Sequence, residues 1–232
     1  MMAVEICAYS ARDAALAVAA GADRIELCRA PESDGLTPSR ATLKAASELL
    51  LHLPVHPIIR PRDDFTITAD DFSQMTAAIT AARSLGYPGV VFGGLTYGST
   101  IEPDWVAVAE LMRVSSGLSV TFHRAFDLVT DQPAALVRLA ELGVQRILTS
   151  GAPGAAVDHL DRLADLVVLG SRHSVTIMAG GGVTSGNVDT LLAVGITELH
   201  ASAGGSHGAF DIAEVGRLIR ITRAGVDQPE PE

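Results

Sequence analysis

Apolar runs with a helical spacing alternate along the chain with short β-rich runs, which predicts strands that are each followed by a helix. Four times an alanine- and leucine-rich run ends at a glycine, and a β-rich run follows. Glycine at this point is typical of a helix C-cap, which needs a residue that tolerates positive φ. The four glycines are Gly21, Gly86, Gly143 and Gly195. This order favours a parallel β/α protein, because antiparallel hairpins need no intervening helix.

Extending the pattern gives eight candidate strands, at 3–8, 24–28, 54–60, 89–93, 118–123, 145–149, 174–179 and 197–202. Helix starts are indicated between them at Thr37–Pro38 and at Thr68 with Asp71. Eight such units in 232 residues, about 29 residues each, predict a single TIM (β/α)8 barrel of the α/β class. We assign residues 1–223 to the barrel and residues 224–232 to a disordered acidic tail. The alternative is a doubly wound sheet, which normally has fewer strands and a glycine-rich first turn.

Polar residues alternate with apolar ones on several of these strands. The outward side chains of a barrel strand pack on helices, so the apolar half of each alternation is expected to face out. This turns Glu5 and Cys7 inward on the first strand, and Glu26 and Cys28 inward on the second. Arg146 stays ambiguous, because it shares its face with Leu148. The other residues expected to face inward are His56, Ile58, Arg60, Thr121, His123, Glu198, His200 and Ser202.

Active sites of TIM barrels lie at the carboxyl ends of the strands, which makes the polar residues there functional candidates. As candidate catalytic residues we take His123, Asp127, Arg60 and Glu198, which have side chains that move protons or orient a substrate. The candidate substrate-binding residues are Arg62, Arg124, His200 and Ser202. The alternative is an interior network of ion pairs that satisfy one another and serve only the fold.

Three glycines, Gly180, Gly181 and Gly182, follow the seventh strand and precede a helix start expected near Thr184 or Ser185. Backbone N–H groups that lead into a helix bind anions, and loops after the seventh and eighth strands of TIM barrels often hold phosphate. The eighth strand supplies a similar loop at 200–206. We therefore expect a phosphate-binding loop, although glycines also serve simply to turn the chain.

The two cysteines lie on neighbouring predicted strands, whose axes are roughly 4.8 Å apart. If their registers agree, Cys7 and Cys28 are placed to hold a soft ion such as Cu(I), which favours thiolate ligands. Zinc is less well matched, because it usually takes three or four protein ligands. The alternative is that both cysteines are small packing residues of the core.

The composition and net charge limit the kinds of partner that we expect for this protein. Hydrophobic residues make up 48% and charged residues 19%, which suits a globular core. The net charge of −10 repels nucleic acid and anionic lipid, so neither is expected as a partner. Without a secretory signal, two cysteines indicate free thiols in the cytoplasm. No organic cofactor is predicted, and the sequence leaves open whether the barrel is a monomer or a homodimer.

Several short segments stand out along the chain: EICAYS at Glu5, GADRIELC ending at Cys28, GLTPS at Gly35, IIRPR ending at Arg62, GVVFG at Gly89, TFHRAFD at Thr121, RILTSG at Arg146, IMAGGGV at Ile177 and ELHAS at Glu198. In this order and at these spacings, they resemble the CutC family of copper homeostasis proteins over nearly the whole chain. The resemblance implies a single TIM barrel and cytoplasmic copper handling. It also implies Cu(I) binding at Cys7 and Cys28. Ala8–Tyr9 departs from the valine–aspartate usual in the family.

Three hypotheses therefore stand. The first is a Cu(I)-binding protein of copper homeostasis. The second is an enzyme acting on a small phosphorylated or anionic substrate, with no reaction fixed by the residues. The third is a barrel with a structural or interaction role, which an interior rich in ionisable groups disfavours.

Overall fold

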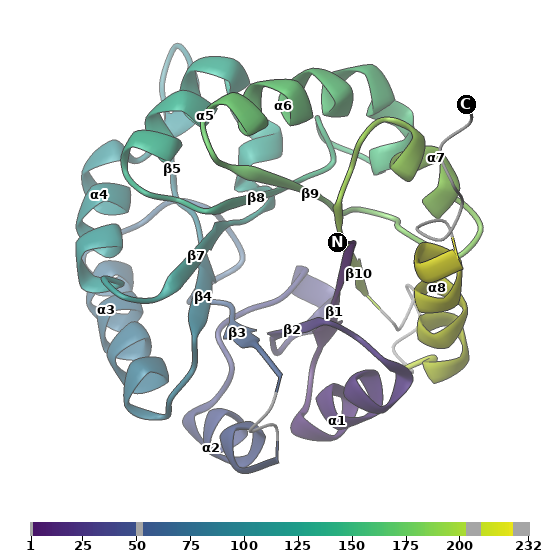
Figure 1. The fold of residues 1–232 in the computed structure, drawn as a ribbon. Helices are drawn as coiled ribbons and strands as arrows, with labels where there is room; N and C mark the ends of the chain where they lie inside the picture. Colours follow the sequence, from purple (N-terminus) through teal and green to yellow (C-terminus); the bar gives the residue numbers. More distant parts are fainter. Residues whose placement is uncertain (1, 50–52, 203–209, 225–232) are drawn as a thin grey trace.

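A computed structural model describes residues 2–49, 53–202 and 210–224. Eight parallel strands stand around a common axis, and the helices surround them (Figure 1). The strand order is β3-β2-β1-β10-β9-β8-β7-β4, and an isolated parallel bridge between Ile58 and Val91 joins the first strand of this order to the last. The fold is therefore the single TIM barrel that the sequence predicts.

The element bounds follow the sequence pattern closely. The barrel strands are β1 (Ala3–Ala8), β2 (Arg24–Leu27), β3 (Val55–Pro57), β4 (Gly89–Phe92), β7 (Ser119–Phe122), β8 (Arg146–Thr149), β9 (Thr176–Ala179) and β10 (Glu198–Ser202). The helices are α1 (Ala11–Ala20), α2 (Arg40–Leu49), α3 (Ala69–Ser84), α4 (Trp105–Val114), α5 (Gln132–Glu141), α6 (Leu160–Arg172), α7 (Val188–Ala193) and α8 (Ile212–Ala224).

Local signals at the helix ends explain much of this agreement. Gly21, the C-cap of α1, has φ of 100°, and the three other glycines of the repeated pattern also have positive φ. Thr68 and Asp71 form the expected capping box at the start of α3. The start signal at Thr37–Pro38 is wrong, because α2 begins at Arg40. There the Ser39 hydroxyl accepts a hydrogen bond from the Thr42 backbone N–H at 3.1 Å.

The strand register decides which inward residues meet. Glu5 lies opposite Arg24 of β2 and opposite His200 of β10. One inward step further along, Cys7 lies opposite Glu26 and Ser202. The barrel interior is thus built in levels, with polar residues of adjacent strands side by side. Arg146 and Leu148 both face inward, which resolves the ambiguity of that strand.

A short antiparallel hairpin, β5 (Leu95–Tyr97) and β6 (Ile101–Pro103), lies between β4 and α4 and was not predicted. Its two strands have only three residues each and therefore give no clear alternation. A backbone hydrogen bond from Thr130 N–H to the Ile101 carbonyl at 2.9 Å ties it to the loop before α5.

Two expectations fall largely outside the described residues. The predicted tail begins at Ala224, which is the last residue of α8, and residues 225–232 are not described. Of the predicted loop at 200–206, residues 203–206 are likewise not described. Among the described helices, none combines the length and apolar character that crossing a membrane requires.

Candidate functional site

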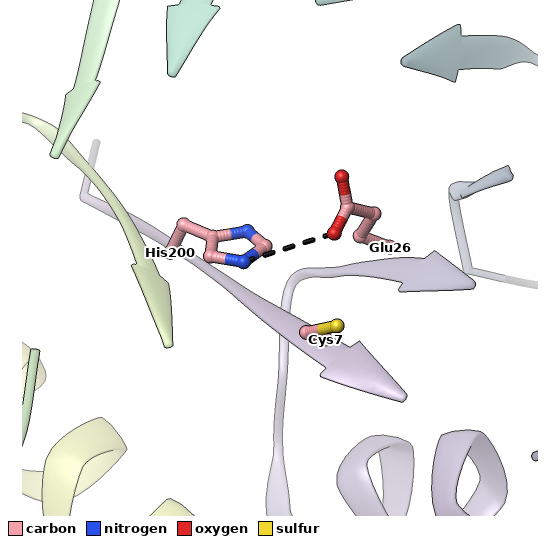
Figure 2. A group of neighbouring side chains, drawn as sticks. All are labelled: Cys7, Glu26 and His200. Atoms are coloured by element: carbon pink, nitrogen blue, oxygen red, sulfur yellow. Dashed lines mark ion pairs between the residues drawn. The ribbon is translucent and has the colours of Figure 1, made fainter. Parts of the chain in front are cut away.

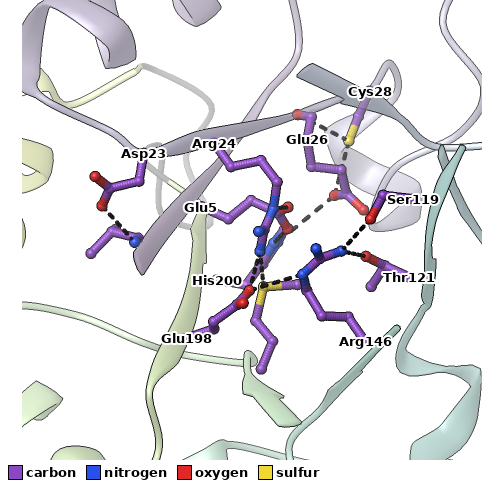
Figure 3. A network of polar contacts seen from close by, with 12 residues as sticks. Glu5, Asp23, Arg24, Glu26, Cys28, Ser119, Thr121, Arg146, Glu198 and His200 are labelled. Atoms are coloured by element: carbon purple, nitrogen blue, oxygen red, sulfur yellow. Dashed lines mark hydrogen bonds and ion pairs between the residues drawn. The ribbon is translucent and has the colours of Figure 1, made fainter. Parts of the chain in front are cut away.

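The half of the barrel interior near the amino ends of the strands holds a network of buried ion pairs, which we call the lower network: Glu5, Arg24, Arg146 and Glu198 (Figure 3). Arg24 contacts Glu5 and Glu198, each at 2.5 Å. Arg146 Nε lies 3.1 Å from Glu198 Oε2. Two acids and two guanidinium groups balance in charge, which is the condition for tolerating them away from water.

The electrostatics of Glu5 reflect this pairing. Burial alone would raise the pKa of Glu5, but Arg24 and then His200 outweigh burial and hold the pKa well below its usual range. His56, which faces the same interior, has no strong partner of this kind. Burial lowers the pKa of His56 to about 4, with Glu5 opposing the shift, so the ring is neutral at neutral pH.

Above the lower network lie the two cysteines. The Sγ atoms of Cys7 and Cys28 are 3.1 Å apart, and both cysteines are free and buried. The Cys28 thiol also lies 3.2 Å from Glu26 Oε2, so its single proton can be donated either to Glu26 or to Cys7. The sequence expectation that the two thiols meet inside the barrel agrees with this geometry. We call Cys7 and Cys28 the sulfur pair.

His200 and Glu26 lie beside Cys7, one member of the sulfur pair (Figure 2). One ligand atom from each of Cys7, Glu26 and His200 lies within 4.8 Å of the other two. His200 Nε2 is 3.8 Å from Glu26 Oε2, and His200 Nδ1 is 2.8 Å from Glu5 Oε1. His200 therefore links the sulfur pair to the lower network, and the grouping offers sulfur, nitrogen and oxygen ligands to a metal ion.

The groups around the sulfur pair shift the pKa values of the two thiols in opposite directions. The hydrogen bond from Cys28 lowers the pKa of Cys7 to about 5, against burial and with help from His200. Burial raises the pKa of Cys28 well above its usual value, and the neighbouring Cys7 adds to the shift. Burial would lower the pKa of His200, but Glu26, Cys7 and Glu5 raise it well above its usual value. Cys7 is therefore the thiol that ionises first.

A cavity of about 370 Å³ opens above the sulfur pair, at the carboxyl ends of the strands, and we call it the mouth. Cys7, Glu26 and His200 line it near the sulfur pair, and Arg60, Phe65 and His123 also line it. Volumes of this size are typical of small-molecule sites, and the carboxyl ends are where TIM barrels place them.

Gly93, at the end of β4, makes the room for His123. A Cβ atom at Gly93 would lie 2.6 Å from the His123 ring, closer than real side chains approach. The His123 Nδ1 atom accepts a hydrogen bond from the Ala125 backbone N–H at 3.2 Å. Burial, followed by the charge of Arg60, lowers the pKa of His123 to about 3. The imidazole is therefore neutral at neutral pH.

Asp127 is held by four contacts rather than left free for proton transfer. It accepts hydrogen bonds from Thr149 Oγ1, from both the backbone N–H and the hydroxyl of Ser150, and from Arg124 Nε. Arg124 donates further to Ser150 Oγ and to the Gly154 carbonyl. Within the described residues no hydrogen bond joins Asp127 to His123, another of the candidate catalytic residues.

The glycine loop reaches the mouth without the expected helix start. Gly181 and Gly182 line the mouth, both with positive φ, and the Arg124 guanidinium packs against Gly181. Gly180 lies against Leu148 and His200 instead. The following helix, α7, begins at Val188 rather than near Thr184 or Ser185 and has six residues. Phosphate binding by this loop therefore stays a prediction.

The remaining candidates divide between the mouth and other parts of the molecule. Ser202 lines the mouth. Glu198 belongs to the lower network, and the Arg62 side chain, 42% exposed, pairs with Asp64 and Asp71. Sequence reasoning ranked Glu26 below residues nearer the strand ends and did not single out Tyr9 or Phe65, which also line the mouth. The register of β1 with β2, which sets Glu26 beside Cys7, is the signal that would have found Glu26.

Comparison with known proteins agrees with this geometry. The model of the CutC family matches residues 2–205. The chain belongs to the CutC family. The family protein CutC of Klebsiella pneumoniae (strain 342) is 44% identical over 205 residues, which are 88% of this chain and 81% of the relative. The relative from Salmonella enteritidis PT4 has the same identity and coverage.

Solved structures show the same relationship. The CutC structure from Streptococcus agalactiae, described as a copper homeostasis protein, matches with a TM-score of 0.81 and 30% identity, over 86% of this chain and 98% of that chain. Phosphoribosyl anthranilate isomerase from Thermus thermophilus matches with a TM-score of 0.63 and 15% identity, over 97% of this chain and 100% of that chain. The second likeness shows the barrel fold alone, whereas the first lies within the CutC family.

Proposed function

We propose that this CutC family member binds Cu(I) in copper homeostasis, with Cys7 and Cys28 as thiolate ligands. The observation that carries the proposal is the 3.1 Å separation of the two Sγ atoms inside the barrel. Thiolates are ligands that Cu(I) prefers, and the two thiols come from neighbouring strands that hold them in place. The name of the Streptococcus agalactiae relative supports the same assignment.

The geometry sets a condition on binding. A metal–thiolate bond is about 2.3 Å long in zinc sites, so two such bonds to sulfurs 3.1 Å apart would enclose an angle of only about 85°. The sulfurs therefore have to separate when the ion enters. His200, with a ring atom in the same group as Cys7 Sγ, offers a nitrogen ligand on the mouth side once it gives up the proton that the neighbouring acids favour. Because Cys7 lines the mouth, copper reaches the sulfur pair from that side.

We further propose that this takes place in the cytoplasm. Both cysteines are free thiols, and a reducing compartment keeps a close thiol pair from forming a disulfide.

An anaerobic titration with Cu(I) against a competing chelator tests the proposal. We expect tight binding of one ion by the reduced protein, and loss of that binding in Cys7→Ser and in Cys28→Ser. Met178→Leu is the matched control, because it removes a buried sulfur that lies 3.1 Å from Arg24 in the lower network. Binding that persists unchanged in both serine variants would contradict the assignment.

A further inference from the structure

The mouth contains two buried hydrogen-bond donors that lie apart from the sulfur pair. They are Nε2 of His123 and Nε of Arg60, and neither atom has a hydrogen-bond partner among the described residues. Both side chains line the mouth and are nearly inaccessible, with 4% of His123 and 7% of Arg60 exposed. Buried polar groups in folded proteins almost always have partners, so two unpartnered donors in one cavity point to a missing acceptor.

Both atoms can act only as donors in this arrangement. His123 Nδ1 accepts from the Ala125 backbone N–H, which places the ring proton of the neutral imidazole on Nε2. Arg60 is always protonated. Its Nη1 atom donates to the carbonyls of Ser33 and Gly35, and its Nη2 atom to the Asp63 carbonyl. These contacts fix the guanidinium and leave the Nε–H group unused.

Both side chains contact the same aromatic ring, that of Phe65. The guanidinium carbon of Arg60 lies 4.8 Å from the centroid of Phe65, and the His123 ring centroid lies 5.2 Å from the same centroid. Arg60 follows β3 and His123 follows β7, the two strands that flank β4 in the barrel. Both side chains therefore line the same side of one cavity, next to Phe65.

The charge of the mouth determines the kind of acceptor. Arg60 and Arg124 both line it. The carboxylate paired with Arg60 is that of Asp63, which is 72% exposed and 3.4 Å away. Glu26, Asp34 and Asp127 are the acids in the lining, and the contacts of Asp127 are saturated by hydrogen-bond donors. A buried guanidinium with an exposed, distant partner favours a ligand that carries negative oxygen.

We propose that the mouth binds a small organic oxyanion, a carboxylate or a phosphate, whose oxygens accept hydrogen bonds from His123 Nε2–H and Arg60 Nε–H. The site lies beyond the sulfur pair and does not depend on copper. A cavity of about 370 Å³ accommodates a small metabolite. Carboxylate and phosphate share the required chemistry, and the experiment distinguishes them.

Calorimetry on the reduced, metal-free protein provides the test, with oxalate as the carboxylate probe and inorganic phosphate as the phosphate probe. We expect at least one probe to bind, and the one that binds more tightly identifies the class. His123→Phe keeps a ring without the donor and should weaken binding about tenfold, the effect of one hydrogen bond to a charged group. Arg60→Lys keeps the charge but removes Nε–H and should weaken binding to a similar extent.

Two controls separate this proposal from the copper assignment. His173→Phe changes an exposed histidine at the end of α6 and should leave anion binding unchanged. Cys7→Ser should also retain anion binding, and His123→Phe should retain the Cu(I) titration of the parent. Failure of the copper assignment would therefore not imply failure of the anion site.

A second readout needs no variant. The Nε2–H proton of His123 should shift in the NMR spectrum of the imidazole groups when the binding probe is added to the parent protein. The proposal is overturned if neither probe binds at millimolar concentration, or if His123→Phe binds the probes as tightly as the parent does.

Discussion

The two halves of the barrel interior bury polar groups in different ways. In the lower network each charge has a partner of the opposite sign, and Arg24 alone bridges Glu5 and Glu198. Around the mouth, Glu26 Oε1, His123 Nε2 and Arg60 Nε have no hydrogen-bond partner among the described residues. In the lower network Arg146 Nε also lacks a hydrogen bond, but the Glu198 carboxylate of opposite charge lies 3.1 Å away. Paired charges serve the fold, whereas unpaired buried groups reduce stability and are typical of functional sites. The difference separates residues that hold the barrel together from residues that are available to a ligand.

Breaking the lower network should have the largest effect. Arg24→Met leaves Glu5 and Glu198 buried with much of their compensating charge removed, and should lower the free energy of unfolding by about 3–5 kcal/mol. Urea denaturation of the purified protein measures the loss. Adding Glu5→Gln to this variant should recover part of it, because an unpaired buried charge is removed. A loss below about 1 kcal/mol for Arg24→Met would mean that the network contributes little.

The two halves should also respond to pH in opposite directions. The pKa of Glu5 is lowered from 4.5, so its contribution to stability is present above pH 4.5 and is lost as the pH falls towards the folded pKa. Burial raises the pKa of Glu26 from 4.5 to about 8, so the metal-free protein should lose stability as the pH rises from 4.5 to 8. The groups that face Glu26 are Cys7, Cys28 and His200, with Glu5 beyond them.

Two variants, compared with the parent, measure how the free energy of unfolding changes with pH in each range. Glu5→Gln should flatten the acid limb of the stability profile, and Glu26→Gln should flatten the limb between pH 4.5 and 8, each by more than about 1 kcal/mol. Urea unfolding over this pH range, with the metal-free protein, gives both limbs. Profiles of the same shape for the two variants would show that the levels of the barrel are not electrostatically distinct.

The smallest effect on stability should come from the mouth. His123→Phe removes the unpartnered Nε2 donor, but it also removes the Nδ1 acceptor of the Ala125 backbone N–H. The free energy of unfolding should therefore fall by about 1–2 kcal/mol, less than in Arg24→Met. Thermal and urea unfolding provide the comparison with Arg24→Met. A large loss of stability would assign His123 to the fold rather than to a binding site.

The strands and helices of the barrel could be predicted from the sequence, because hydrophobic periodicity and helix-capping signals are local properties of the chain. The eight predicted strands match the observed ones to within three residues at each end, and the capping box at Thr68 forms as expected. The inward turn of Cys7 and Cys28 also follows from alternation along single strands.

The site itself was harder to predict, because it depends on the register between strands. Glu5 and Glu26 are each the third residue of their strands, yet Glu5 joins the lower network and Glu26 lines the mouth. Phe65 lies in a loop, where no periodicity indicates its contact with His123. The spacing of residues along the chain does not contain these relations, which arise from the stagger of neighbouring strands.

The lower network also acts as a floor, since its buried and half-buried side chains occupy the interior beneath the sulfur pair. Copper and an oxyanion would then both enter through the mouth, and an anion held at His123 and Arg60 would lie in the cavity that leads to Cys7. A bound anion would slow the arrival and the escape of copper by the same factor, leaving its equilibrium affinity unchanged. Residence time, rather than affinity, would then be the property of the metal that metabolites regulate.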